Sequence, residues 1–558
     1  MNKFLYLLVC FFFFFSCIRE KTQENTSVKD VESLKLFTKF TTKETGITFK
    51  NQIQEYTFLN FLTYEYLYNG SGVSVGDLNG DGLADIFFIS TLGENELYLN
   101  SGNMKFRNIT KESKINGNKQ TYGFTTGSTM VDINSDGKLD IYVCKSGRLN
   151  DPDMRRNELY INQGADKNGV PVFKEDAARY QLDLPHQSTQ AAFFDYDKDG
   201  DLDMFLINHG TDSAYPIEDI PELLKTPSVY QSERLFRNDN GKFTDVSEAT
   251  GIIGNGISFG LGIAIGDLNN DGWPDILTGQ DYLEKDHLYL NQKDGIFKDV
   301  ITQSTRHIPS SSMGNDIADF NNDGILDFMG LDMISDNDYV NKNSMTSLSP
   351  EYFYQVIGNG LYYQYTINTL QLNNGNFGNN NIPVFSDIAQ LAGVPGTDWS
   401  WGPLFFDMDN DGYKDLFVSN GIKRDFINND YLDYKNIRLT QYLHDFETSK
   451  DREKLLQDCI NDLMVRMPGR FKTNAFFRNN GDLTFTKENT NWDIEALTSS
   501  NGAAFADLDN DGDLDIITNN IDDNAFIYRN NTTELNVGNN FIQFQLQGPK
   551  QNPDGIGT

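Results

Sequence analysis

Cysteine, histidine and basic residues are all scarce in this chain of 558 residues, and each shortage excludes a class of protein. Two of the four cysteines, Cys10 and Cys17, lie in or directly after a hydrophobic N-terminal run. The other two are Cys144, which follows a predicted strand, and Cys459, which lies in a predicted helix. A scaffold held together by several disulfides is therefore not expected.

The five histidines are scattered without the spacing of metal ligands; they are His186, His209, His287, His307 and His444. We also expect no nucleophile elbow of the Gly-x-Ser-x-Gly type and no phosphate-binding loop. No catalytic constellation emerges, and we expect that the protein is not an enzyme. The abundant carboxylates nevertheless leave open a glycosidase-like pair of acids.

Basic residues number 46 against 80 acidic ones, which gives a formal net charge of −34. Proteins that bind nucleic acids contact phosphates through clusters of lysine and arginine. An acidic chain of this kind is therefore not expected to have a nucleic-acid partner.

Long hydrophobic runs are also missing, apart from the run Phe4 to Phe15 near the N-terminus. A helix that spans a bilayer needs about 20 apolar residues, so residues 1–16 are predicted to be a signal peptide. Ser16 and Cys17 resemble the end of a bacterial lipobox, which predicts lipidation at Cys17 and a polar tether over residues 17–36. We expect an exported lipoprotein at the bacterial outer membrane or cell surface, attached to the membrane only by lipid. An ordinary secreted protein cleaved nearby is the alternative.

One acidic pattern of nine residues, Asp-x-Asp/Asn-x-Asp-Gly-x-x-Asp, occurs seven times. A hard cation such as Ca²⁺ binds six to eight oxygen atoms at about 2.3–2.6 Å. Positions one, three, five and nine supply side-chain oxygens, position seven supplies a backbone carbonyl, and glycine at position six tolerates unusual dihedral angles. The pattern predicts up to seven Ca²⁺ sites, with solvated acidic turns as the alternative.

The predicted ligands are, loop by loop, Asp77, Asn79, Asp81, Leu83 and Asp85; Asp132, Asn134, Asp136, Lys138 and Asp140; Asp195, Asp197, Asp199, Asp201 and Asp203; Asp267, Asn269, Asp271, Trp273 and Asp275; Asp319, Asn321, Asp323, Ile325 and Asp327; Asp407, Asp409, Asp411, Tyr413 and Asp415; and Asp507, Asp509, Asp511, Asp513 and Asp515. An EF-hand would need a glutamate at position twelve and helices on both sides. No loop has a carboxylate at position twelve, and short apolar runs typical of strands flank the loops, such as 86–89 and 191–194. Each loop is therefore predicted to join two strands.

Downstream of each loop comes a second signature, an apolar stretch that ends in asparagine, as in 97–100 and 288–291. In most units a turn and an aromatic strand follow it. One unit is thus strand, calcium loop, strand, strand, turn, strand, which predicts an all-β, seven-bladed β-propeller of four-stranded antiparallel blades. Residues 37–49 resemble an orphan fourth strand and are predicted to complete the last blade, which removes exposed sheet edges.

Over residues 37–531 the repeats resemble the FG-GAP/VCBS repeats of integrin α-chain propellers, a resemblance that implies calcium binding and cell adhesion. The whole layout resembles bacterial relatives of the cartilage acidic protein family. Residues 540–546 and 552–558 resemble the opening of an ASPIC/UnbV domain, so 532–558 is predicted to be the start of a truncated domain of this type.

Insertions between the second and third strands are predicted at about 204–234, 328–369 and 416–475, with a smaller one in the second unit. In an up-and-down blade these connections emerge opposite the calcium loops. Tyrosines are frequent in 328–369; we expect them mainly to pack the insertion onto the propeller, with ligand recognition as the alternative. The stretch 398–402 is likewise expected to pack within its blade.

The insertion 416–475 is predicted to contain a helix, because Thr448 to Asp451 resemble a capping box and apolar residues recur at helical spacing from Leu456 to Met464. We expect its apolar face to dock on the propeller, with a partner helix as the alternative.

Together these features predict a calcium-binding, non-enzymatic envelope lipoprotein that binds a protein or glycan through the face opposite its calcium loops. The alternatives are a polysaccharide-acting lyase or glycosidase on a propeller scaffold, and an assembly partner in an envelope complex.

Overall fold

The computed structural model describes residues 34–115, 123–147, 151–211, 215–344, 350–378, 381–535, 538–544, 546–548, 552, 555 and 556. The predicted signal peptide, Cys17 and most of the predicted tether lie outside the described residues. The elements below belong to one unit, Lys35–Thr558. Among the helices described, none combines the length and the apolar character that crossing a membrane requires.

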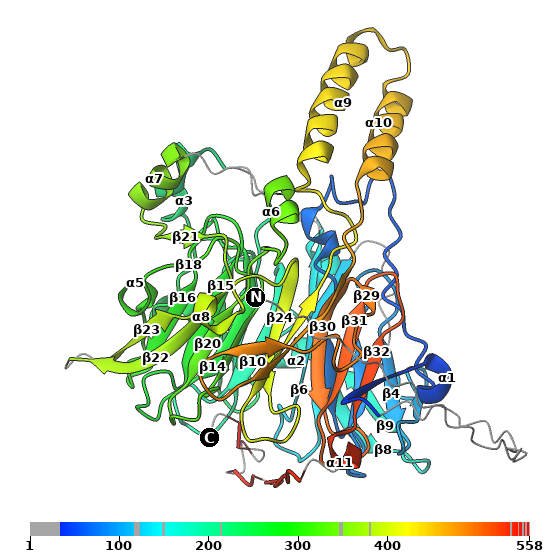
Figure 1. Ribbon diagram of the computed structural model, residues 1–558, viewed down its shortest axis with the longest axis vertical. Helices are drawn as coiled ribbons and strands as arrows, with labels where there is room; N and C mark the ends of the chain where they lie inside the picture. Colours follow the sequence, from blue (N-terminus) through cyan, green and yellow to red (C-terminus); the bar gives the residue numbers. More distant parts are fainter. Residues whose placement is uncertain are drawn as a thin grey trace, which may run out of the picture. The chain divides into compact units, whose positions relative to one another are not determined.

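The described part of the chain forms seven four-stranded antiparallel sheets (Figure 1). In order along the chain they are β2 (Val73–Gly76), β3 (Asp85–Phe88), β4 (Glu96–Asn100) and β5 (Phe106–Asn108); β6 (Gly123–Val131), β7 (Asp140–Gly147), β8 (Glu158–Ala165) and β9 (Pro171–Glu175); β10 (Ser188–Phe194), β11 (Asp203–Asn208), β12 (Arg234–Asn238) and β13 (Phe243–Asp245); β14 (Gly260–Gly266), β15 (Asp275–Gln280), β16 (His287–Asn291) and β17 (Phe297–Asp299); β19 (Asn315–Ala318), β20 (Asp327–Gly330), β22 (Thr369–Phe377) and β23 (Ile382–Asp387); β24 (Ser400–Phe406), β25 (Asp415–Asn420), β27 (Ala475–Asn479) and β28 (Phe485–Lys487); and β30 (Ser500–Ala506), β31 (Asp515–Asn520), β32 (Phe526–Asn530) and β1 (Phe37–Phe40).

The first strands of these sheets contact one another in a closed cycle, from β2 through β6, β10, β14, β19 and β24 to β30, which contacts β2 again. Sheets arranged around an axis in this way form a β-propeller. The predicted fold class, mostly β with repeated four-stranded antiparallel sheets, is therefore confirmed. Glycines permit the close approach at the axis: a Cβ atom on Gly314 would lie 2.2 Å from the carbonyl oxygen of Trp401, and one on Gly502 would lie 2.5 Å from that of Ser71.

The N-terminal strand β1 completes the seventh sheet by pairing with β32, with Phe37 opposite Asn530. The strand is shorter than the sequence predicts, because helix α1 (Thr42–Thr45) follows it directly. Thr41 and Glu44 form a capping box that stabilises this helix, and Gly46 ends it with a positive φ of 85°.

The core lies between neighbouring sheets and follows the twofold alternation of strands. In β3, Ile86 and Phe88 pack against the seventh sheet, whereas Phe87 and the following residue, Ile89, pack against the second. All four residues are fully buried. Strands covered on both faces in this way are apolar without interruption.

Helices occupy several connections between strands. The elements are η1 (Glu65–Tyr68), η2 (Pro152–Arg155), α2 (Ala177–Tyr180), η3 (Ile217–Asp219), α3 (Ile220–Leu223), α4 (Ser247–Thr250), α5 (Ile301–Ser304), α6 (Asp338–Ser344), α7 (Pro350–Gly358), α8 (Ala389–Ala392), α9 (Asn429–Thr448), α10 (Arg452–Arg466) and α11 (Thr532–Leu535). Two small ribbons accompany them, formed by β18 (Ile308–Pro309) with β21 (Gln364–Tyr365) and by β26 (Lys472–Thr473) with β29 (Leu497–Thr498).

The connection between β25 and β27 contains two helices rather than one (Figure 1). Helix α9 was not predicted, and α10 begins after Asp451, whose side chain accepts a hydrogen bond from the backbone of Lys454 at 3.0 Å. The predicted capping box is therefore wrong in detail, because Thr448 is the last residue of α9. The two helices pack on each other, and Leu463 and Met464 of α10 are buried, while Leu456 is 43% exposed.

Residues 51–70, called the cap segment here, connect the N-terminal region to β2. Their side chains form one apolar cluster with residues of the second and sixth sheets, of the connections beside them and of both long helices. Leu67 of the cap segment is fully buried, and Phe61 stacks on Phe426 at 4.0 Å between ring centroids.

Candidate functional site

The seven acidic loops share one hydrogen-bonding pattern. In every loop the glycine at position six donates its backbone N–H to the aspartate at position one, at 2.6–3.1 Å. The backbone N–H of position seven donates to the carboxylate at position five, at 2.9–3.1 Å. Position four has a positive φ in all seven, at Gly80, Ser135, Lys198, Asn270, Asn322, Asn410 and Asn510. The side chains at positions one and five are thus held on the inside of a tight turn.

The aspartate at position nine is fully buried in each loop and is bonded to the asparagine of the second signature. One of its oxygens accepts the backbone N–H of that asparagine at 2.7–2.9 Å, in all seven sheets. Burial raises the pKa of Asp85, Asp140 and Asp327 to about 7, that of Asp275 and Asp415 to about 8, and that of Asp203 to about 9. A cation beside such a carboxylate would favour its charged form.

The same asparagines also bond neighbouring sheets to each other. In six sheets the side-chain amide donates to the carbonyl of position two in the preceding loop, at 2.7–2.9 Å. The series includes the bond from Asn100 in the first sheet to Leu508 in the seventh, at 2.8 Å. The recurrence of asparagine was visible in the sequence, but its role between sheets was not predicted.

Several oxygens of the loops are buried without a hydrogen-bond partner in the described structure. They are Oδ1 of Asp195, Asp201, Asn269 and Asp509 and Oδ2 of Asp327. Carboxylate oxygens lie within 4.8 Å of one another in three groups of loop residues: Asp195, Asp197 and Asp199; Asp407, Asp409 and Asp415; and Asp507, Asp509 and Asp511. Buried oxygens without donors suit a bound cation, and these three groups lie in the loops with aspartate at position three.

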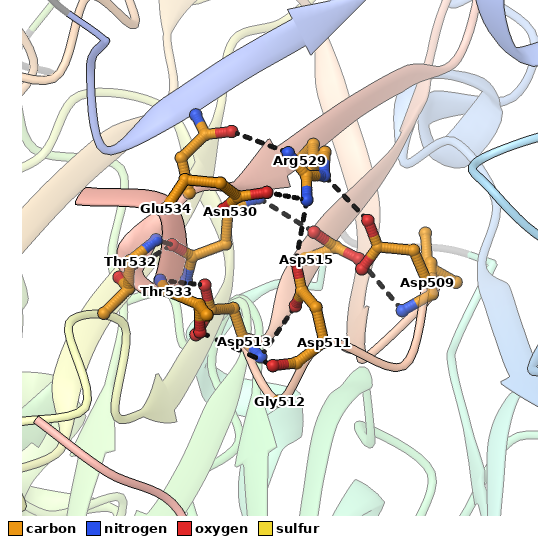
Figure 2. Close-up of polar contacts among 12 residues, drawn as sticks. Asp509, Asp511, Gly512, Asp513, Asp515, Arg529, Asn530, Thr532, Thr533 and Glu534 are labelled. Carbon is orange, nitrogen blue, oxygen red and sulfur yellow. Dashed lines mark hydrogen bonds and ion pairs between the residues drawn. The ribbon is translucent and has the colours of Figure 1, made fainter. Parts of the chain in front are cut away.

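A positively charged side chain, that of Arg529, lies beside the seventh loop. The guanidinium of Arg529 in β32 donates to Asp509 at 2.7 Å and to Asp511 at 2.8 Å, and it also pairs with Glu534 (Figure 2). Arg529 thus neutralises the carboxylates at positions three and five, which a metal ion in this loop would need as ligands. Ion pairs also reach position five in two other loops, from Lys138 to Asp136 and from Lys293 to Asp271.

At the opposite end of the sheets, the cap segment is held by the same position of four successive sheets. The sixth residue after position nine is Thr91, Ser146, His209 and Asp281 in the first four sheets. Thr91 bonds Asn51 at 3.1 Å. Tyr64 bonds Ser146 at 2.7 Å and His209 at 3.2 Å, and Tyr66 donates to Asp281 at 3.0 Å.

Ser146 and His209 are 2.7 Å apart, as in a nucleophile and its base. Both side chains are nonetheless buried, and the serine hydroxyl also bonds Gln187 and Tyr64. Burial lowers the pKa of His209 to about 4, so this histidine is neutral near pH 7. The pair therefore fastens the cap segment.

The expectation that no Gly-x-Ser-x-Gly stretch occurs is wrong, since residues 72–76 and 256–260 match the pattern. Neither serine lies at a turn from strand to helix. Ser74 is inside β2 and bonds Ser128 at 2.8 Å, and the buried Ser258 donates to Gln280 at 3.2 Å. Both serines are therefore structural.

The aromatic residues of the insertions divide into two groups. Tyr339 and Tyr354 are at least 70% exposed, whereas Tyr362 packs against the fourth sheet and donates to the carbonyl of Thr305 at 2.8 Å. Trp399 is fully buried, and the neighbouring Asp398 binds Arg470 at 2.6 Å. The stretch therefore packs, as expected, but Trp399 packs against the cap segment rather than only within its blade. Cys144 and Cys459 are buried and form no disulfide.

Comparison with known families identifies the repeat. A model described as "FG-GAP-like repeat" matches residues 77–143, 132–206, 222–278 and 455–518. The chain contains FG-GAP-like repeats. Each matched segment includes at least one of the acidic loops described above, and the resemblance inferred from the sequence is confirmed at this level.

Two curated proteins are similar to part of this FG-GAP-repeat chain. Cartilage acidic protein 1 of Xenopus tropicalis is 28% identical over 139 residues, and that of Mus musculus is 31% identical over 140 residues. Each match covers 25% of this chain and 20% of the relative. The chain thus matches about a fifth of the length of these relatives.

Solved structures give only distant likeness. A GH43 β-1,3-galactosidase with galactodeoxynojirimycin is 11% identical, covering 57% of this chain and 93% of that one, with a TM-score of 0.27. A Photorhabdus luminescens Tc holotoxin pore is 11% identical, covering 82% and 17%, with a TM-score of 0.28. The exo-β-1,3-galactanase of Phanerochaete chrysosporium is 8% identical, covering 63% and 75%, with a TM-score of 0.28. The assignment of the fold therefore depends on the seven sheets and on the cyclic contacts between their first strands.

Proposed function

We propose that this protein is a calcium-stabilised propeller that serves as a non-enzymatic binding module of the bacterial envelope. The observation that supports this proposal is the separation of two ends of the sheets. The acidic loops follow the first strand of each sheet at one end. The long insertions follow the second strand at the other end, where the cap segment leads into β2. Calcium would then stabilise the scaffold, and the insertion end would bind a protein or glycan.

The loops would hold Ca²⁺ through the side chains at positions one, three, five and nine and the carbonyl at position seven, and the ion would neutralise carboxylates that the fold brings together. The chain's own bonds already set the turn and fix position nine. Metal binding is therefore expected to add stability to a preformed site rather than to fold the loop.

Chelation tests the calcium part of the proposal. We expect the melting temperature to fall by several degrees in excess EGTA and to return when Ca²⁺, but not Mg²⁺, is restored. The double variant Asp195→Asn, Asp199→Asn should show a smaller loss on chelation. An unchanged melt in EGTA would remove calcium from the proposal.

A glycan array combined with a polysaccharide-degradation screen tests the binding part. A module that only binds should retain a ligand without releasing products, whereas product release would favour the alternative of a polysaccharide-acting enzyme. Lipid attachment at Cys17 belongs to the same proposal, and a Cys17→Ser variant should leave the membrane fraction of the cell.

A further inference from the structure

A cavity of about 290 Å³ lies on the axis of the sheets at the insertion end. Its walls are the first residues of the inner strands of all seven sheets, together with Tyr64, Tyr66 and Asn69 of the cap segment. Neither the acidic loops nor the helical insertions contribute to it. Its size is near the lower end of the range of small-molecule pockets, about 300–1,000 Å³.

We propose that this cavity binds one uncharged, polyhydroxylated molecule the size of a sugar ring. The inference rests on the proposed function, because it names the ligand class that the insertion end recognises. Three properties of the cavity support the inference. They are its hydrogen-bonding groups, its aromatic surface and its lack of charge.

Two amide side chains lining the cavity retain free hydrogen-bonding groups. Asn69 makes no side-chain hydrogen bond to any described residue, and the carbonyl oxygen of Gln190 accepts none from them. The hydroxyls of Thr126 and Thr189 donate to the carbonyls of Ser188 and Gly260 at 2.8 and 2.9 Å, so each still has an oxygen that can accept. The cavity thus offers both donors and acceptors, as a set of ligand hydroxyls requires.

Two aromatic rings of the cavity are fixed before any ligand enters. The indole N–H of Trp401 donates to the carbonyl of Gly421 at 2.7 Å, and the hydroxyl of Tyr66 donates to Asp281 at 3.0 Å. The polar edges of these rings are therefore occupied. The ring of Tyr66 also packs against His209 and Phe259, with ring centroids 4.6 and 5.7 Å apart, so the indole of Trp401 is the ring that offers an apolar surface to the C–H face of a sugar. Rings held in place lose little conformational entropy on binding.

The cavity carries no charge on the residues described. Its lining includes no aspartate, glutamate, lysine or arginine, and its one titratable histidine, His209, is neutral near pH 7. A charged ligand would lose hydration there without gaining an opposite charge, which disfavours uronates and phosphates relative to neutral sugars.

Saturation-transfer NMR with purified protein and single sugars tests the inference. The probes are glucose, galactose, mannose, fucose and N-acetylglucosamine, with glucuronate and inorganic phosphate as charged counterparts. We expect at least one neutral sugar to bind, and the double variant Asn69→Ala, Gln190→Ala to weaken it about tenfold or more. The matched control is Gln303→Ala, Gln390→Ala, which removes two exposed amides from the short helices α5 and α8 and should bind as the wild type does.

Asn69→Ala alone serves if the double variant does not fold, since Asn69 is only partly buried and has a helical φ of −64° that alanine adopts freely. The inference is overturned if no neutral sugar binds, if both cavity variants bind like the control, or if glucuronate or phosphate binds more tightly than every neutral sugar. Retention on the glycan array by the double variant would likewise reject the cavity while leaving the wider binding function standing.

Discussion

At the scale of residues, the recurring asparagine in the third strand of each sheet connects three parts of the fold. Its backbone fixes position nine of its own loop, and in six sheets its side chain reaches the loop before it. The sequence reveals that this asparagine recurs, but not why, because the partner carbonyl comes from another repeat. A buried amide between two backbone groups is costly to remove, since its partner is left without a donor.

Replacing Asn291 by alanine should therefore destabilise the protein. The substitution leaves the carbonyl of Tyr196 without its donor at 2.8 Å, and we expect the free energy of unfolding to fall by about 1–3 kcal/mol. Chemical denaturation measures the loss. Asn436→Ala, at an exposed site on α9, is the control, and equal stability of the two variants would contradict the role assigned to Asn291.

Arg529 makes the seventh loop different from the others. The variant Arg529→Gln should lower the melting temperature in EGTA, because the carboxylates of Asp509 and Asp511 then repel each other without a neighbouring cation. In calorimetric titrations the same variant should bind Ca²⁺ at this loop more tightly than the wild type. Arg107→Gln is the control, since Arg107 lies in β5 and pairs with Glu112 rather than with an acidic loop. Calcium binding that is the same in both variants would show that Arg529 does not compete with the metal.

At the scale of elements, the sequence predicts strands better than helices. Strands around the loops were predictable because both their faces are buried and their apolar runs are uninterrupted, as in β3. Helix α9 was missed because its apolar residues, such as Ile437 and Leu443, are exposed rather than gathered on a core face. The geometry of the acidic loops was largely readable, whereas the cap segment and the cavity were not, because their contacts join residues far apart in the chain.

The outer part of the α9–α10 hairpin should be dispensable for folding. Replacing residues 437–457 by a short Gly-Ser linker removes mainly exposed side chains, and we expect little change in the melting temperature. By contrast, Met464→Ala at the buried base should cost about 2–5 kcal/mol. Thermal melts of both variants decide the matter, and unfolding of the shortened protein would show that the hairpin supports the sheets.

At the scale of the whole molecule, β1 joins the N-terminal region to the last sheet. Phe37 of this strand is buried against Phe476 and Trp492, with ring centroids 5.5 and 5.8 Å apart. The repeat count predicted this closure, since the seventh unit lacks a fourth strand of its own. Pairing β1 with β32 also covers an edge that could otherwise bind another chain.

Phe37→Ala should therefore weaken the whole protein by about 3–5 kcal/mol and promote association through the loosened edge. Chemical denaturation and light scattering measure the two effects. Phe377→Ala is the control, because that phenylalanine is 80% exposed. A variant at Phe37 as stable and as monomeric as the control would show that closure does not depend on this contact.

The bond from Asn100 to Leu508 uses the same two positions as the other bonds between sheets. The junction between the first and last sheets is thus chemically equivalent to five of the six junctions inside the chain. These bonds do not depend on where the chain begins and ends. Circularly permuted forms that start at another sheet would therefore retain all of them.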